Sequence, residues 1–472
     1  MTSAILILVT LAVLTLPLTA GAQTQTPSSP AQTAPSPAIA AQTGPPTTPA
    51  VVPLGISGAL TPWLQVRGEL RTRVEGFTGG GFTSGVPGSK DAYFMDRFRL
   101  NATVRPSQTL SFVVQAQDSR AFDKTAGAKA SPLRNTFDLR MAYGEFGAST
   151  TVRVGRQELA FGEQRLIGHA NWLNNARTFD GGRLTLKRQG LQLDAFAASV
   201  VTIRPEAFDK SGSGNALYGA YASLNALLPS QAVEPYFFWR RSPALAAELG
   251  GTATINQATT GIRMAGKLAA NVDYSGEAAI QTGSLGPDAV RAWGGHALVG
   301  KTFGSVASKP RLFGEYNYAS GDSDPADGRR GTFDQLYPTA HDKYGLADQV
   351  GWRNIEHLRT GVELKPTQKL QLSGGYHSWW LASATDALYG AGGTAVVRST
   401  AGTAGTHVGQ EIDIQAAFAY SPQFQINGGY AYLVPGQFLK NLTPGRHYSY
   451  PFIMATYVFL GEQPALGGRR AQ

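Results

Sequence analysis

Residues 152–186 read VRVGRQELAFGEQRLIGHANWLNNARTFDGGRLTL, and their pattern indicates the fold class of the chain. It begins and ends with short strand-like segments, VRV and RLTL, and a polar, glycine-punctuated arc lies between them. Arg153, Arg183 and Lys187 fall on the alternate positions where a soluble sheet would place a second apolar face. A sheet with lipid on one side and water on the other requires this pattern. We therefore predict that the arc is a loop that leaves the top of a barrel wall, turns over the opening and returns.

The period of two continues along the chain from residue 61. For example, Phe98 and Leu100 alternate with Arg97 and Arg99. Strict alternation over about ten residues is the signature of a transmembrane strand, and here it repeats. Short turns also alternate with long polar loops. We predict an all-β fold, a transmembrane antiparallel up-and-down β-barrel of about 18 strands with short periplasmic turns and long extracellular loops. Residues 137–146 give no clear assignment to the inner or outer face.

The composition agrees with this class of protein. Of 472 residues, 15% are charged and 10% aromatic, with 56 glycines, as is typical of barrels with lipid-facing walls and aromatic girdles. The formal net charge is +9, but the basic runs and recognition modules of nucleic-acid-binding proteins are absent from the sequence. With no cysteine, the chain has no disulfide and no thiolate metal site. It also lacks an H-E-x-x-H motif, a P-loop and a nucleophile elbow, so we predict neither an enzyme nor a cofactor.

The ends of the chain differ from its middle. Residues 1–22 contain an apolar run followed by Ala20-Gly21-Ala22, which predicts a secretory signal peptide, although no Lys or Arg stands near its start. Residues 23–53, rich in Pro, Thr, Ala and Gln, predict a disordered periplasmic leader. Residues 54–460 form the predicted barrel and residues 461–472 a tail. We expect a location in the outer membrane of a Gram-negative cell, with both termini periplasmic.

Soluble all-β folds are the structural alternative. A sandwich would show continuous apolar faces toward a dry core. A propeller would show a sequence repeat of about 40–50 residues, and the chain contains none.

Three blocks of the sequence resemble the alginate export family of outer-membrane proteins. They are GRQELAFGEQRLIG…NWLNNARTFDGGRL (residues 155–184), GTFDQLYPTAHDKYGLADQVGWRNI (331–355) and VGQEIDIQAAFAYSPQFQINGGYAYLVPGQFL (408–439). The resemblance implies an arginine-rich lumen through which an acidic polysaccharide, such as alginate, leaves the cell. Implied partners are this polysaccharide, outer-membrane lipid and lipopolysaccharide, and periplasmic export components. The proline-rich leader and the tail after the last strand depart from the family pattern.

The alternation also selects candidate site residues. Arginine presents a planar fork matched to carboxylates, and interleaved acids keep any one site from holding an anion too tightly. The alternation does not decide which way Arg156 points. A barrel interior can also contain Arg–Glu ladders that select nothing. The residues predicted to line the lumen and bind the polymer are Arg67, Arg71, Arg73, Arg97, Arg99, Arg153, Arg156, Arg165, Arg177, Arg183, Arg263 and Arg359.

The segment 320–350 is too long for a passive connection. We predict that it folds over or into the mouth as a gating loop, with Arg329, Arg330 and Lys343 offering charge to a passing chain. Its aspartates lack the glutamate that completes an EF-hand, so no metal site is predicted.

The function expected from these features is passive export of an anionic polysaccharide. Two other functions fit the same fold. One is a general anion-preferring porin for small solutes, and the other is a structural or adhesive barrel with a plugged lumen.

Overall fold

The computed structural model describes residues 63–127, 132–225, 231–247, 250–341 and 343–460, which all belong to one compact unit. The predicted signal peptide (1–22), leader (23–53) and tail (461–472), with residues 54–62 of the predicted barrel, lie outside the described residues.

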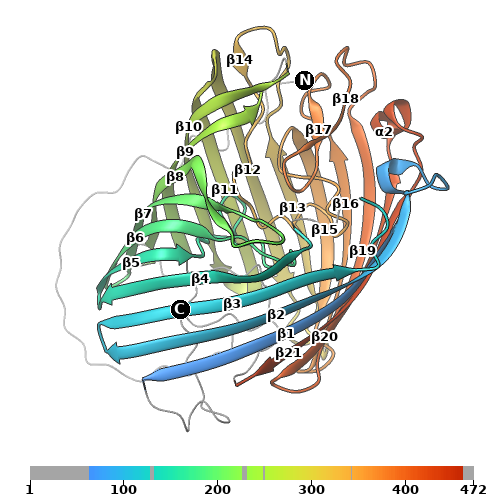
Figure 1. Ribbon diagram of the computed structural model, residues 1–472. Coiled ribbons are helices and arrows are strands. Elements are labelled where there is room, and N and C mark those ends of the chain that lie inside the picture. The colour runs from blue at the N-terminus through green and yellow to red at the C-terminus, as the bar shows by residue number, and fades with distance from the viewer. Residues whose placement is uncertain (1–62, 128–131, 226–230, 248–249, 342, 461–472) are drawn as a thin grey trace. The chain divides into compact units, whose positions relative to one another are not determined.

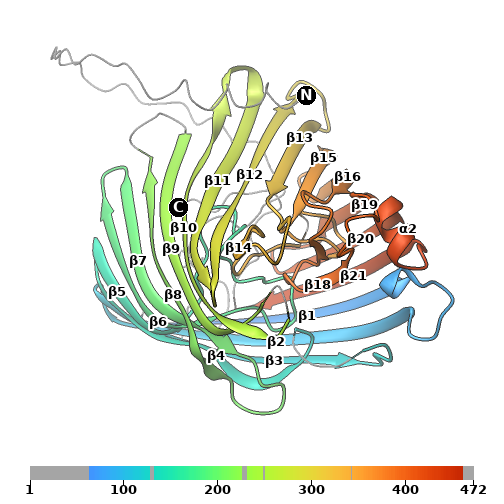
Figure 2. The same cartoon turned by 90° about the horizontal axis from the view of Figure 1, so that it is seen from above.

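The described chain forms a closed antiparallel β-barrel of 18 strands, with only 3% helix. Each strand pairs with the next, and the last strand pairs with the first, so the predicted fold class is confirmed (Figures 1 and 2). The strands are β1 (Leu64–Thr78), β2 (Lys90–Ser107), β3 (Leu110–Phe122), β4 (Asn135–Gly147), β5 (Thr150–Gln157), β6 (Phe179–Arg188), β7 (Leu191–Thr202), β8 (Lys210–Leu224), β9 (Gln231–Ala246), β10 (Thr252–Leu268), β11 (Val272–Leu285), β12 (Asp288–Thr302), β13 (Arg311–Ala319), β15 (Ile355–Leu364), β16 (Leu370–Trp380), β19 (His407–Ala419), β20 (Phe424–Pro435) and β21 (Tyr448–Phe459).

The remaining elements are short and lie in the connections. They are η1 (Gly80–Phe82), η2 (Ala269–Asn271), β14 (Arg329–Arg330), β17 (Ala387–Tyr389), β18 (Ala395–Arg398) and α2 (Gln437–Leu442). Among the described residues, no helix is long and apolar enough to cross a membrane.

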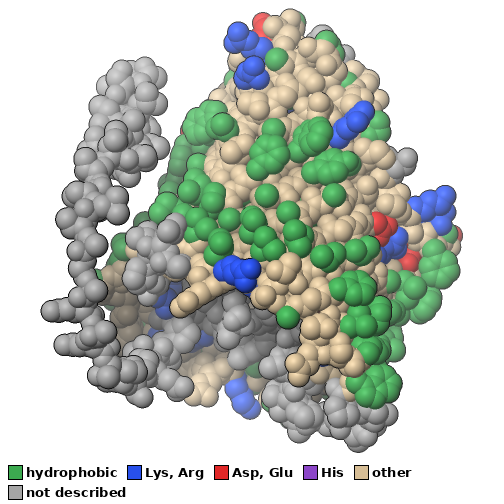
Figure 3. Space-filling model, turned by 90° about the vertical axis from the view of Figure 1, so that its left-hand side faces the viewer, with side chains coloured by type: hydrophobic (Ala, Val, Ile, Leu, Met, Phe, Trp, Pro, Cys, Tyr) green, Lys and Arg blue, Asp and Glu red, His purple; other side chains and the backbone are tan. Residues whose placement is uncertain are grey.

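The two faces of the wall differ in polarity. On β1, Leu70 and Val74 are 45% and 43% exposed, whereas Arg71 and Arg73 between them are 4% and 2% exposed. Hydrophobic side chains spread over the outer wall in the same way elsewhere (Figure 3). In a bilayer these exposed apolar side chains meet acyl chains, while the backbone groups behind them are paired within the closed sheet.

The connections differ in length between the two ends of the barrel. Turns of two to eight residues join the strands at one end, which we call the short-turn rim. The opposite end, the long-loop rim, carries the long connections, although β11 and β12 are joined there by residues 286–287 alone. Two long connections are central to the site: residues 158–178, between β5 and β6 (loop A), and residues 320–354, between β13 and β15 (loop B).

A β-bulge explains why residues 137–146 gave no clear assignment to a face. In the pairing of β3 with β4, Gln115 is opposite Met141 and Ala116 is opposite Leu139, so Arg140 has no partner in the ladder. The extra residue shifts the alternation by one position along β4.

A charge on the outer wall tests the lipid-facing assignment. Ile280 is 59% exposed in the middle of β11, and Ser284 is on the same face near the long-loop end of the strand. Ile280→Arg is expected to lower the free energy of unfolding in phospholipid vesicles by about 2–4 kcal/mol, because it buries a cation in hydrocarbon. The matched Ser284→Arg change is expected to cost less than about 1 kcal/mol, because charge near the interface is tolerated. Equal costs would contradict the assignment.

Candidate functional site

Loops A and B fold into the barrel from the long-loop rim. Phe161 and Ile167 of loop A and Tyr344 and Trp352 of loop B are buried in one hydrophobic cluster with side chains of the barrel wall. Figure 2 shows connecting chain inside the ring of strands. The two loops also meet directly through a β-bridge between Ile167 and Tyr337. Together they narrow the interior, so a solute crossing the barrel has to pass them.

Loop A is anchored on an aromatic ladder on the inner face of β7, β8 and β9. Its Phe161 ring stacks on Phe196 and Tyr221, with ring centroids 5.3 and 4.9 Å apart. Tyr236 and Phe238 extend the ladder at 4.8 Å. The alternation of polar and apolar residues does not predict these aromatic positions. The sequence does contain a signal for the ladder, because its aromatic residues stand at positions where the alternation requires polar side chains on the inner face.

Arginines of β1 and β2 bind the backbone of loop A. Arg71 and Arg97 donate to the carbonyl of Asn171 at 2.8 and 3.0 Å, and Arg73 donates to that of Trp172 at 2.8 Å. Arg97 also pairs with Glu69 at 2.6 Å. These arginines point inward but are almost fully buried. In the structure they donate hydrogen bonds to backbone carbonyl groups of a loop that forms no regular helix or strand.

The arginines of loop A fix it to the opposite wall and to loop B. Arg165 donates to the side-chain oxygen of Asn317 at 2.9 Å and pairs with Glu315. Arg177 donates to the carbonyls of Gly168 and Tyr337 at 2.9 and 2.7 Å. Burial lowers the pKa of Arg177 to about 10, so the side chain stays charged at neutral pH.

Two loop carboxylates are surrounded by cations. Burial alone raises the pKa of Glu163, but the neighbouring His296 and the guanidinium groups of Arg165 and Arg263 hold it well below its usual range. Burial likewise opposes ionisation of Asp334, yet Arg240, Arg353 and Arg330 lower its pKa to about 2. Both loops therefore carry ionised carboxylates inside the barrel at neutral pH.

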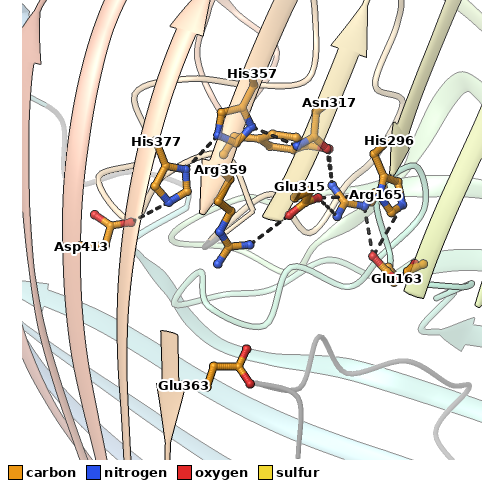
Figure 4. Close-up of polar contacts among 12 residues, drawn as sticks. Glu163, Arg165, His296, Glu315, Asn317, His357, Arg359, Glu363, His377 and Asp413 are labelled. Atoms are coloured by element: carbon orange, nitrogen blue, oxygen red, sulfur yellow. Dashed lines mark hydrogen bonds and ion pairs between the residues drawn. The ribbon is translucent and has the colours of Figure 1, made fainter. Parts of the chain in front are cut away.

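A row of polar side chains runs across the inner face of β13, β15, β16 and β19, next to Arg165 of loop A (Figure 4). We call Glu315, Asn317, His357, Arg359, His377 and Asp413 the polar row.

The members of the polar row are joined one to the next. Nδ2 of Asn317 lies 3.1 Å from Nδ1 of His357, whose Nε2 lies 3.0 Å from Nδ1 of His377. Nε2 of His377 lies 3.2 Å from Asp413. The backbone N–H of Leu346 in loop B donates to Asp413 at 3.0 Å. The row therefore connects Arg165 of loop A to the backbone of loop B.

Arg359 is the partly exposed arginine of this row. Its side chain is 20% exposed, and its bond to Glu315 is long, at 3.4 Å. It lines a small pocket with Phe313, His377, Asp413 and Gln415. The side chains present cation, carboxylate and amide groups around an aromatic ring.

The remaining arginines that were predicted to line the lumen lie on strands of the barrel wall. Arg183 pairs with Asp194 at 2.8 Å, Arg153 with Glu145 at 2.5 Å, and Arg263 with Glu163 at 3.1 Å. Arg99 donates to the Asn171 side chain at 2.7 Å, and Arg67 is half-buried on β1.

Arg156 does not face the lumen. It shares the outer side of β5 with Val152 and Val154, which are 42% and 54% exposed, and pairs with Asp180 at 2.8 Å. The pairing of β5 with β6 runs without a bulge through Gln157, so Arg156 lies on the other face of β5 from Arg153.

The three residues predicted to act in a gating loop all lie in loop B. Arg329 and Arg330 form β14, which pairs in parallel with Ala289 and Val290 of β12, and Lys343 is buried. Arg330 lies among the cations that lower the pKa of Asp334. Among the described residues, no group of three or more His, Asp or Glu side chains is placed to hold a metal ion.

The binding of loop A by arginine can be tested by hydrogen exchange. Arg97→Met removes the bonds to Asn171, Leu173 and Glu69 but keeps the side-chain length. Charged hydrogen bonds contribute about 2 kcal/mol here, so amide exchange around residue 173 is expected to accelerate roughly thirty-fold.

Arg105→Met is the matched control, because Arg105 is on the same face of β2 and bonds Gln65 rather than loop A. The control is expected to leave exchange in loop A unchanged. If both variants behave alike, Arg97 does not hold the loop.

Comparison with known proteins agrees with this architecture. Residues 62–450 match the family described as alginate export. Among solved structures, Pseudomonas aeruginosa OpdQ is 13% identical with a TM-score of 0.57, covering 84% of this chain and 97% of that one. Acinetobacter baumannii OccAB2 is 12% identical with a TM-score of 0.56, covering 84% of this chain and 98% of that one. At this identity the likeness shows the fold alone. No curated protein matches the chain.

Proposed function

Because this chain belongs to the alginate export family, we propose that it passively exports an anionic polysaccharide, such as alginate, across the outer membrane. Family and fold are those of outer-membrane channels, which are not enzymes. The family match over residues 62–450 carries the proposal, because it spans nearly the whole described barrel and both inner loops. Synthesis of the polymer behind the channel supplies the gradient.

Inside this channel, the arginines divide into two groups. Arg71, Arg97 and Arg165 are buried and hold loop A, so they set the shape and the positive potential of the narrow region. Arg153 and Arg359 keep 13% and 20% of their side chains exposed, so they are the ones we assign to direct contact with carboxylates. Nearby acids weaken each contact, which lets a chain move on.

The shape of the interior also suits a polymer better than a compact solute. Loops A and B are held to the wall by many separate bonds, so the narrow region is preorganised. A flexible chain can pass such a region one residue at a time, with each carboxylate replacing the last on the same guanidinium.

A general anion-preferring porin is the second candidate, favoured by the likeness to outer-membrane Occ/Opd porin structures. The packing of loops A and B inside the barrel also fits a plugged structural or adhesive barrel. Conductance in planar bilayers distinguishes these three functions. An exporter shows anion preference and block by oligouronates that weakens as salt rises. A small-solute porin shows steady currents that oligouronates do not reduce, and a plugged barrel shows none.

Within the exporter account, Arg359→Gln is expected to weaken oligouronate block about tenfold, because it removes one charge-assisted bond worth about 1.4 kcal/mol. Arg120→Gln is the control, since Arg120 is exposed on the outer face of β3 and pairs with Asp118 there. It is expected to leave the block unchanged. Identical blocking constants for the wild type and Arg359→Gln would remove Arg359 from the site.

A further inference from the structure

The short-turn rim carries an excess of positive charge. Its described turns contain Lys309, Lys365 and Lys369 and no carboxylate. The cations in these turns, or within two residues of the adjoining strand ends, are Arg105, Lys187, Arg188, Lys267, Lys301, Lys309, Arg311, Lys365 and Lys369. The carboxylates over the same positions are Glu145, Asp273 and Glu363.

These carboxylates are already bound by arginine. Arg311 pairs with Asp273 at 2.6 Å and with Glu363 at 3.0 Å. Glu145 pairs with Arg153 at 2.5 Å. The exposed Lys187, Lys267 and Lys369 therefore have no ion pair with a carboxylate among the described residues.

Several of these lysines are directed at the mouth rather than at lipid. Lys187 follows the inward-facing Arg183 by four residues on β6, and Lys267 follows the inward-facing Arg263 by four residues on β10. Lys365 follows Glu363 of β15 by two residues. Two-residue alternation places them on the inner face, and Lys187 and Lys267 are exposed there.

Neighbouring turns bring like charges together. The backbone N–H of Lys365 donates to the carbonyl of Ser308 at 2.7 Å, so the turn with Lys365 lies against the turn with Lys309. Burial lowers the pKa of Lys365, Glu363 raises it, and Lys309 lowers it again. The repulsion between the two lysines is relieved when an anion binds between them.

The opposite rim shows no comparable excess. In the described connections of the long-loop rim, cations and carboxylates occur in nearly equal number. The acids there include Asp123, Glu206, Asp324, Asp327 and Asp348. The two mouths of the barrel therefore present different potentials to a charged solute.

We propose that Lys187, Lys267, Lys365 and Lys369, with Arg105, form a basic collar that captures the free end of a polyanionic chain at the short-turn rim. This inference rests on the proposed export function and adds where the polymer is first bound and from which side it enters. The collar is on the side that we assign to the periplasm, so capture precedes passage between loops A and B.

Lysine suits this step better than arginine. An exposed ammonium is a strongly hydrated point charge on a flexible stem, so it attracts an anion over a Debye length without holding it in a fixed geometry. The collar therefore raises the association rate of the polymer. The tighter guanidinium contacts lie deeper, where Arg359 faces the pocket of the polar row.

Side-specific block in planar bilayers tests the collar. Ser305, in the turn between β12 and β13, is replaced by cysteine in every protein studied, because the chain has no cysteine of its own. An impermeant maleimide then reports which way each channel has inserted. An oligouronate is added to one compartment, and the association and dissociation rates of block are measured at low and high salt.

The variant Lys187→Gln/Lys267→Gln/Lys369→Gln changes three exposed side chains at the short-turn rim. Its matched control is Lys90→Gln/Lys210→Gln/Lys440→Gln, which changes three exposed lysines toward the long-loop rim. The collar variant is expected to lose about tenfold in association rate from the short-turn side at low salt, with the dissociation rate unchanged. The control is expected to match the parent protein, and high salt is expected to remove the difference.

Equal association rates in the collar variant and its parent would overturn the collar while leaving export intact. An equal loss in the control variant would also overturn it, because net charge alone would then explain the effect. Absence of oligouronate block from either side in the parent protein would overturn the proposed export function itself, and the collar with it.

Discussion

Closure of the sheet by pairing of β1 with β21 is the constraint on which the rest of the structure depends. In hydrocarbon an unpaired backbone N–H or carbonyl costs several kcal/mol, so a sheet that crosses a membrane cannot leave an edge open. Once the cylinder is closed, every second residue of each strand must face inward. Phe98 and Leu100 then meet lipid, and Arg97 and Arg99 have to find partners inside.

Those partners come from two sources, and the choice shapes the interior. Some guanidinium groups pair with carboxylates on neighbouring strands, as Arg183 does with Asp194. Others bind backbone carbonyls of the inner loops, as Arg71 and Arg73 do with residues 171 and 172. A buried arginine without a partner would be costly, so the loops and the arginines stabilise each other. We propose that the same charges also give the passage a positive potential.

The sequence predicted the barrel because alternation in each strand is a local property. It predicted which face most arginines occupy for the same reason. It did not predict their partners, since Arg71 and Asn171 are 100 positions apart and nothing in either local pattern links them. The bulge at Arg140 shifts the alternation of β4, and the aromatic ladder places Phe196 and Tyr221 on a face where polar residues were expected. His357 joins the polar row only because β13, β15 and β16 are side by side in the barrel.

A transport measurement tests whether this barrel carries a negatively charged polysaccharide through a positively charged interior. Purified protein in vesicles is loaded with two fluorescent oligosaccharides of equal length, an oligouronate and a neutral glucan, and the release of each is followed over time. We expect faster release of the oligouronate than of the glucan, and we expect added salt to slow it. Equal release of both, or faster release of the neutral chain, would contradict this expectation.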